Sequence, residues 1–144
     1  MHLITRGFIT FFDELTGYNC SITMGKEVHF HDFKEGDRKM IGRIWHGWTT
    51  PANADAYEAL LKSEIFVGIR DRNIPGYRGI QLFRRDVGRE VEFVTIMWFD
   101  DLDAVRIFAG EDYETAVVPP KARQVLHRFD ERSQHYEVRA AMSI

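Results

Sequence analysis

Residues 90–99, EVEFVTIMWF, carry the clearest secondary-structure signal of the chain. β-branched and aromatic residues dominate this stretch and neither Pro nor Gly interrupts it, so a strand is predicted over residues 90–99. Asp86-Val87-Gly88 precedes the strand and is typical of a hairpin turn. Residues 77–85 are therefore expected to form the neighbouring antiparallel strand.

The residues on either side of this hairpin predict two helices and two further strands. Residues 41–48 have a strand pattern, and Thr49-Thr50-Pro51 favours a helix start, because Pro is favoured in the first helical turn. Asp100 is predicted to cap a second helix over residues 101–108. The remaining elements are a turn or short helix at residues 113–117, a helical segment at residues 121–126 and a strand at residues 129–138.

The predicted order is strand, helix, strand, strand, helix, strand. This is the order of the ferredoxin-like, split βαβ fold of the α+β class, in which helices cover one face of an antiparallel sheet. The other face would carry Trp and Phe side chains into water. Two copies are therefore expected to pack these faces together as a homodimer that encloses a cavity.

The first part of the chain has weaker signals. Residues 1–39 are expected to be an N-terminal extension that is weakly structured or that precedes the true start at Met40, with one short strand near residues 28–33. Residues 40–138 are expected to form the domain and residues 139–144 a C-terminal tail. His29 and His31 share a face in such a strand, but no third ligand is specified, so no metal site is expected.

Composition limits the partners and the compartment. The 144 residues are 44% hydrophobic and 28% charged, which is typical of a globular chain. The net charge of −3 lacks the basic balance of nucleic-acid-binding proteins, so no nucleic-acid partner is expected. No run approaches the roughly 20 apolar residues of a membrane span, so no membrane partner is expected either. The single Cys20 excludes an internal disulfide, and a cytoplasmic location is expected.

Four stretches carry a resemblance to a known family: residues 40–49, 74–79, 92–99 and 108–113. They resemble the antibiotic biosynthesis monooxygenase (ABM) family of dimeric α/β barrels. The layout is similar over residues 40–138, with a strand ending near Trp98, an acidic helix start and a Gly-acidic-acidic-Tyr turn. The resemblance implies a cofactor-independent monooxygenase that oxidises an aromatic or quinol-type small molecule.

The haem-degrading members of that superfamily have a different residue pattern. They place Asn on the first strand, Trp in the second helix and His shortly after it. This sequence has Arg43 or Ile44, Phe108 and Val117 at those places, and Val117 cannot ligate iron. No cofactor is therefore expected.

Oxygenation without a cofactor requires a dry aromatic pocket, a base, and donors for the anion that forms. His46 and His135, on strands that are neighbours in this fold, are the expected catalytic residues. The expected substrate-binding residues are Trp48, Gln81, Thr95, Met97 and Arg43. Alternation along residues 41–48 places Ile44, His46 and Trp48 on one face and Ile41, Arg43 and Trp45 on the other.

Several alternatives stay open. The two histidines could be half-buried residues at the dimer interface. Arg43 could form an ion pair with Glu92 or with an acidic residue of the second copy, or it could hold an acidic substrate. The chain could also be a non-catalytic, small-ligand-binding or stress-related dimer, or an isomerase or decarboxylase on the same scaffold. A base paired to an orienting carboxylate inside the cavity would favour an enzyme.

Overall fold

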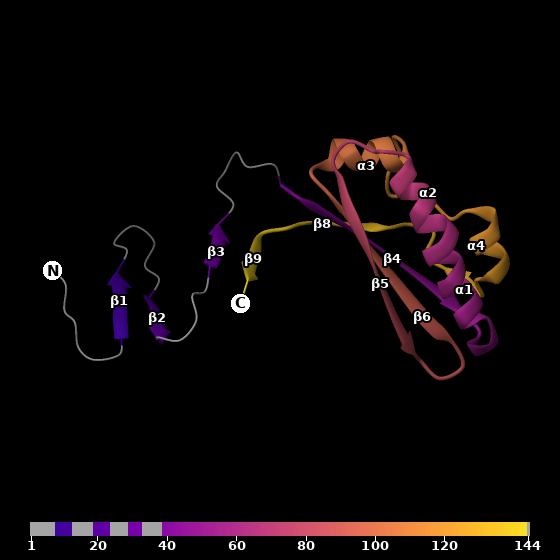
Figure 1. Ribbon diagram of the computed structural model, residues 1–144, viewed down its shortest axis with the longest axis horizontal. Helices are drawn as coiled ribbons and strands as arrows, with labels where there is room; N and C mark the ends of the chain where they lie inside the picture. The colour runs from indigo at the N-terminus through magenta and orange to yellow at the C-terminus, as the bar shows by residue number, and fades with distance from the viewer. Residues whose placement is uncertain (1–7, 13–18, 24–28, 33–38, 144) are drawn as a thin grey trace. The chain divides into compact units, whose positions relative to one another are not determined.

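The computed structural model describes residues 8–12, 19–23, 29–32 and 39–143, which divide into two units. The first unit contains two antiparallel strand pairs (Figure 1). In one, β1 (Phe8–Phe12) pairs with β2 (Asn19–Thr23). In the other, β3 (His29–Asp32) pairs with β9 (Ala140–Ser143).

The strand expected near residues 28–33 is thus present as β3, while residues 28 and 33 lie outside the described residues. β1 and β2 are two further strands, which the sequence analysis did not predict. The aromatic and β-branched run of β1 is a strand signal, which the sequence interpretation underweighted. The side chains of His29 and His31 are outside the described part of the chain.

The second unit contains a five-stranded antiparallel sheet with the order β5-β6-β4-β7, in which β8 also pairs with β4. The strands are β4 (Ile41–Thr49), β5 (Tyr77–Asp86), β6 (Val91–Phe99), β7 (Arg128–Phe129) and β8 (Gln134–Glu137). The helices are η1 (Pro51–Asn53), α1 (Ala54–Leu60), η2 (Leu61–Ile65), α2 (Phe66–Asp71), α3 (Leu102–Ala109) and α4 (Pro120–Val125). This arrangement is the ferredoxin-like fold predicted from the sequence.

The α helices lie on one side of the sheet (Figure 1). Cross-strand pairs put Ile41 opposite Phe99 and Arg43 opposite Met97, and these side chains face the helices. The intervening residues of each strand face the other way. We call that second surface the open face, and it contains Ile44, His46, Trp48, Gln81, Phe83, Val94, Ile96 and Trp98. The alternation predicted for residues 41–48 is confirmed.

Two features of the helices differ from the prediction. The first helical segment contains one π turn, η2, between α1 and α2. The N-cap of α3 is Asp101 rather than Asp100, because the Asp101 carboxylate accepts a hydrogen bond from the Ala104 N–H at 2.9 Å. Asp100 instead accepts two hydrogen bonds from Arg78, both at 2.7 Å.

The connection from α2 to β5 requires a glycine. Gly76 has a φ of 82°, which is in the left-handed region, and a Cβ there would lie 2.8 Å from the Ala104 Cβ of α3. The Asp100 N–H also donates to the Gly76 carbonyl at 2.8 Å. This turn therefore fixes α3 against the start of β5.

The end of the domain also differs from the prediction. The final strand is split into β7 and β8. Of the two possibilities predicted for residues 113–117, the structure has the turn and no helix. An isolated bridge between Thr115 and Arg132 joins the turn to the segment between the two strands. The segment also keeps a contact with β4, because the Asp130 N–H donates to the His46 carbonyl at 3.0 Å.

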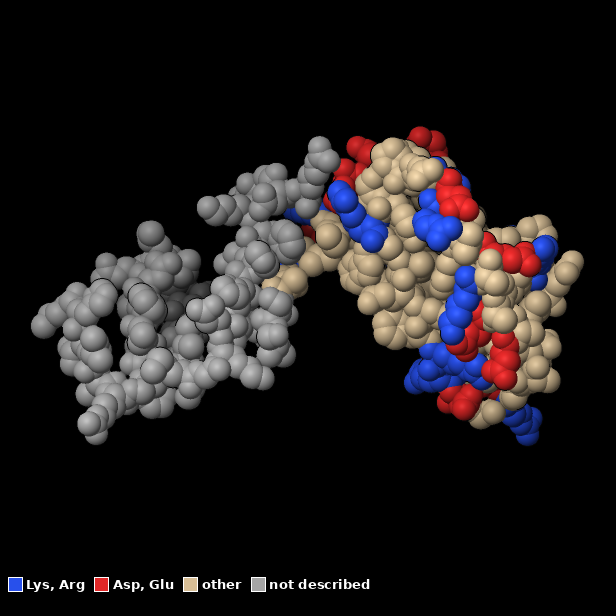
Figure 2. All heavy atoms as spheres, in the orientation of Figure 1, with Lys and Arg blue, Asp and Glu red and all other residues tan. Residues whose placement is uncertain are grey.

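On the face shown in Figure 2, basic and acidic side chains are interleaved over the helices. Arg84 binds Asp55 at 2.7 Å and Glu58 at 2.8 Å, and Lys121 binds Glu64 at 2.6 Å. The charges on this surface are therefore largely paired with one another. None of the described helices is long and apolar enough to cross a membrane.

Candidate functional site

A cavity of about 60 Å³ lies between the sheet and the helices of the second unit. Most of its wall is apolar or aromatic, and the polar exceptions are Arg43, Thr95 and Ser133. The remaining lining residues are Trp45, Tyr57, Leu61, Ile65, Phe66, Ile69, Ile80, Met97, Phe108, Val117, Val118, Pro119 and Ala122. Three of the expected substrate-binding residues, Arg43, Thr95 and Met97, thus share one cavity.

A surface groove adjoins this cavity. It lies between α2 and residues 117–121, and it shares Ile65, Ile69, Phe108, Val117 and Pro119 with the cavity wall. The π turn η2 contains Ile65 and lies at the same place. π turns inside helices are frequent at functional sites, and this one borders both the groove and the cavity.

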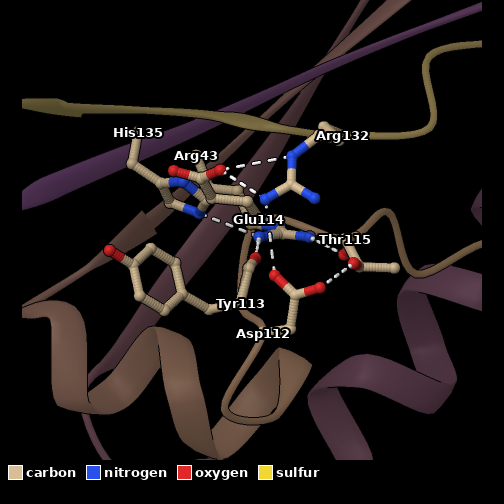
Figure 3. Close-up of polar contacts among 7 residues, drawn as sticks. All are labelled: Arg43, Asp112, Tyr113, Glu114, Thr115, Arg132 and His135. Atoms are coloured by element: carbon tan, nitrogen blue, oxygen red, sulfur yellow. Dashed lines mark hydrogen bonds and ion pairs between the residues drawn. The ribbon is translucent and has the colours of Figure 1, made fainter.

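Arg43 is the most unusual residue of the cavity wall, because its charged side chain is only 3% exposed. Its Nη1 donates to the Tyr113 carbonyl, and its Nη2 donates to the Thr115 carbonyl at 3.0 Å (Figure 3). Among the described residues, no carboxylate pairs with it. Burial lowers the pKa of Arg43 to about 10, so the guanidinium remains charged at neutral pH.

The turn that binds Arg43 is held by a network of its own. Arg132 pairs with Glu114 at 2.6 Å and with Asp112 at 3.4 Å, and the Thr115 hydroxyl donates to Asp112 at 2.7 Å (Figure 3). These contacts fix the carbonyls of residues 113 and 115 toward Arg43. They also direct the nearby acidic side chains to Arg132 rather than to Arg43.

His135 lies directly opposite Arg43 in the β4–β8 pair, and its Nε2 is 2.8 Å from Arg43 Nη1. The guanidinium can only donate, so Nε2 must be the acceptor and the proton of the neutral ring is on Nδ1. Burial, together with the charge of Arg43, lowers the pKa of His135 to about 4. In this state His135 orients Arg43, and its Nε2 is not available to take a proton from a substrate.

The cavity wall also contains hydroxyl groups. Ser133, which is 5% exposed, has a buried hydroxyl with no hydrogen-bond partner. Tyr57 packs edge-on against Phe93, with the ring centroids 4.9 Å apart, and burial raises the pKa of Tyr57. Tyr57 therefore stays protonated. Neither residue has a sequence pattern that points to a site, and both were missed.

The open face carries a second polar group. His46 Nδ1 is 3.0 Å from the Glu92 Oε1, and Arg85 binds the other oxygen of Glu92. These contacts lower the pKa of Glu92, first through the hydrogen bond from His46 and then through that from Arg85. The His46 ring stacks on Trp48 with the centroids 6.0 Å apart, and Arg128 lies over Trp48 at 3.7 Å. The Glu92 carboxylate thus orients the His46 ring through Nδ1. The other ring nitrogen, Nε2, takes no part in this contact.

The expected site residues therefore lie on two faces of the sheet. Arg43, Thr95, Met97 and His135 face the helices, while His46, Trp48 and Gln81 lie on the open face. His46 and His135 are on neighbouring strands as expected, but their side chains point to opposite sides, so the two rings do not form one site. Gln81 accepts a hydrogen bond from Trp98 at 3.0 Å. The Arg43–Glu92 ion pair considered from the sequence is not formed, since Glu92 also lies on the open face.

Among the described residues, no group of three or more His, Cys, Asp or Glu side chains is placed to hold a metal ion. The cavity wall likewise contains none of these residue types. The chemistry that it can perform by itself is therefore the binding and stabilisation of negative charge by Arg43 in apolar surroundings.

No family model matches the chain, and no curated protein matches it in sequence. Among solved structures, it is similar to a proposed antibiotic biosynthesis monooxygenase from Bacillus cereus. The similarity covers 74% of this chain and 99% of that chain, with a TM-score of 0.51 and 12% sequence identity. The two proteins share a fold. At this identity the similarity establishes the fold alone.

Proposed function

We propose that this protein is a monooxygenase that oxidises an aromatic or quinol-type small molecule without a cofactor. The observation that carries the proposal is the buried Arg43, which lies at the wall of an aromatic cavity without a carboxylate partner among the described residues. The fold shared with a proposed monooxygenase agrees with it.

The proposed reaction starts from the ionised substrate. A phenolate or enolate is electron-rich enough to react with O₂, and a fixed positive charge stabilises it in an apolar site. The activated ring carbon loses its hydrogen and gains one oxygen atom as a carbonyl, while the second oxygen atom leaves as water with that hydrogen and the proton released when the substrate ionised. The substrate supplies all the electrons, so no external reductant is needed.

The chain's own residues have distinct roles in this proposal. Arg43 binds the anionic oxygen, and His135 orients Arg43. Thr95 and Met97 form the sheet side of the wall, and aromatic residues of the helices exclude water. The substrate ionises before it binds, so the cavity needs no histidine base.

Oxygen uptake tests the proposal. Anthrone and naphthols would be incubated with the full chain under isotope-labelled O₂, and the product is expected to carry one labelled oxygen atom. Arg43→Lys keeps a charge but loses the planar set of donors, so its rate is expected to fall by about tenfold. Arg70→Lys, on the exposed end of α2, is the matched control and should retain the full rate. Uptake no faster than in protein-free buffer would contradict the proposal.

A second candidate function is proton transfer, as in an isomerase or decarboxylase, and the His46–Glu92 pair favours it. Such an enzyme would use the open face, with His46 Nε2 as the base and Glu92 as its orienting partner. His46→Ala is expected to slow exchange of the acidic C–H of an aryl ketone such as tetralone in D₂O by about 100-fold. Its melting temperature should change little. Equal exchange rates for the variant and the unmodified chain would leave His46 with a packing role.

A small-ligand-binding dimer is the remaining alternative, because the cavity wall lacks a base paired to a carboxylate. Binding without any oxygen uptake or proton exchange would favour it. We propose the homodimer for all three functions, since the open face carries large apolar side chains and Phe83 there is 49% exposed.

A further inference from the structure

Two polar groups of the cavity wall, Arg43 and Ser133, come from neighbouring parts of the chain's fold. Arg43 comes from β4, and Ser133 comes from the segment just before β8, two residues before the His135 that binds Arg43. The side chains that α1, η2 and α2 contribute to the wall are apolar or aromatic, and the Tyr57 hydroxyl is their one polar group. A ligand in the cavity therefore meets one charged side chain, that of Arg43.

One of these two polar groups has no hydrogen-bond partner among the described residues. Arg43 Nη1 donates to the Tyr113 carbonyl and to His135, and Nη2 donates one hydrogen to the Thr115 carbonyl. Arg43 makes no further hydrogen bond to a described residue. The Ser133 hydroxyl is buried and without a partner. A buried hydroxyl without a partner is costly, so a hydrogen-bond acceptor is expected next to Ser133 when a ligand is bound.

The charge of the site selects the kind of acceptor. The guanidinium is positive, and the cavity wall contributes no carboxylate to balance it. We propose that Arg43 and Ser133 together bind one ionised oxygen of the ligand, so that the ligand is an aromatic molecule with a carboxylate or phenolate group. A neutral ligand would leave the buried charge without a counter-ion.

The volume of the cavity indicates where the aromatic ring of the ligand binds. A cavity of about 60 Å³ holds a charged group but is small for an aromatic ring, since an engineered cavity of about 150 Å³ is known to hold benzene. The adjoining groove shares Ile65, Ile69 and Phe108 with the cavity. The ring is therefore assigned to the groove, and the ionised oxygen to the cavity, next to Arg43 and Ser133.

This inference deepens the proposed function by naming the substrate class, and it is tested by binding rather than turnover. Naphthoate, which supplies a carboxylate, and its neutral amide are titrated calorimetrically into the full chain at neutral pH. Nitrophenol supplies a phenolate whose absorption reports its own ionisation. Naphthoate is expected to bind at least about tenfold more tightly than the amide, and bound nitrophenol is expected to ionise at a lower pH than in buffer.

The chain offers a matched pair of variants. Ser133→Ala removes the proposed donor, and Thr49→Val removes the other buried hydroxyl that lacks a partner, which lies outside the cavity wall. Both should melt at or above the temperature of the unmodified protein, because each loses an unpaired polar group. Only Ser133→Ala is expected to weaken binding of the anionic probes, by about tenfold.

The outcomes separate the two proposals. Tight naphthoate binding that depends on Ser133, without oxygen uptake from any phenol, would support this inference and overturn the monooxygenase. Equal affinity for naphthoate and its amide, an unchanged affinity in Ser133→Ala, or no saturable binding of either anion would overturn the inference. If only one anion binds, the ligand class is narrowed to a carboxylate or to a phenolate.

Discussion

Arg43 has hydrogen-bond partners within the protein, yet its positive charge has no counter-ion among the described residues. Backbone carbonyls and a neutral histidine satisfy part of its donor set without neutralising its charge. A carboxylate partner would have done both. The distinction matters because a guanidinium already paired with Glu92 would have little attraction left for an anionic ligand.

His135 gives a prediction for the pH dependence of stability. Its pKa is about 4 in the folded protein and 6.5 in its ordinary state, so the unfolded chain takes up a proton in this range before the folded protein does. Stability is therefore expected to fall as the pH drops from 6.5 to 4. His135→Gln, which keeps an acceptor for Arg43, should show a smaller decline in urea midpoint over that interval. Above pH 6.5 the urea midpoints of the variant and of the unmodified protein should change with pH in parallel. Equal pH dependence of the two midpoints at every pH would contradict the lowered pKa of His135.

Sequence reasoning placed Arg43 and His46 on opposite faces of one strand, as the structure has them, because side-chain alternation is reliable within a strand. It failed to separate His46 from His135, since that requires the register between β4 and β8, which the sequence does not specify. Ser133 gave no signal at all. Its position depends on the interruption between β7 and β8, which is created by contacts with the distant turn at residues 112–115.

At the scale of elements, the prediction was most accurate where local signals were strong. The hairpin of β5 and β6 and the Pro51 start of the first helical segment follow from turn and capping preferences. The π turn η2 and the split of the last strand do not, because both depend on what packs against them. The same tertiary contacts place the groove beside α2.

The glycine turn after α2 can be tested by a pair of substitutions. Gly76→Ala meets a backbone in the left-handed region and the side chain of Ala104, whereas Gly88→Ala meets a similar φ of 89° with open space around it. Gly88→Ala is expected to cost about 1–2 kcal/mol of the free energy of unfolding. Gly76→Ala should cost clearly more, as measured by chemical denaturation. Equal losses would show that α3 moves away without cost.

The sheet of the second unit carries several large apolar side chains on its open face. Ile96→Lys places a charge in the middle of this face and is expected to convert a homodimer to a monomer, as measured by native mass spectrometry. Ile107→Lys is the matched control, since Ile107 is exposed on α3, on the helix side of the sheet. An unmodified chain that is monomeric, or a control that dissociates equally, would contradict the dimer.

Independent folding of residues 40–138 is a second prediction at this scale. A chain that begins at Met40 lacks β1, β2 and β3 and leaves β9 without its partner. The sheet and helices of the second unit are retained in full. The melting temperature is expected to change by less than about 10 °C, as measured by calorimetry. A larger drop would show that the first unit supports the domain.

The contacts of Arg43 determine when the ligand site forms during synthesis of the chain. Arg43 lies near the start of the domain, and its partners Tyr113 and His135 follow 70 and 92 residues later. During synthesis the charged side chain emerges long before anything can enclose it, and contacts between such distant residues form late in folding. Ribosome-bound chains halted before residue 135 would lack the site. Ligand capture would therefore report that the domain has been completed.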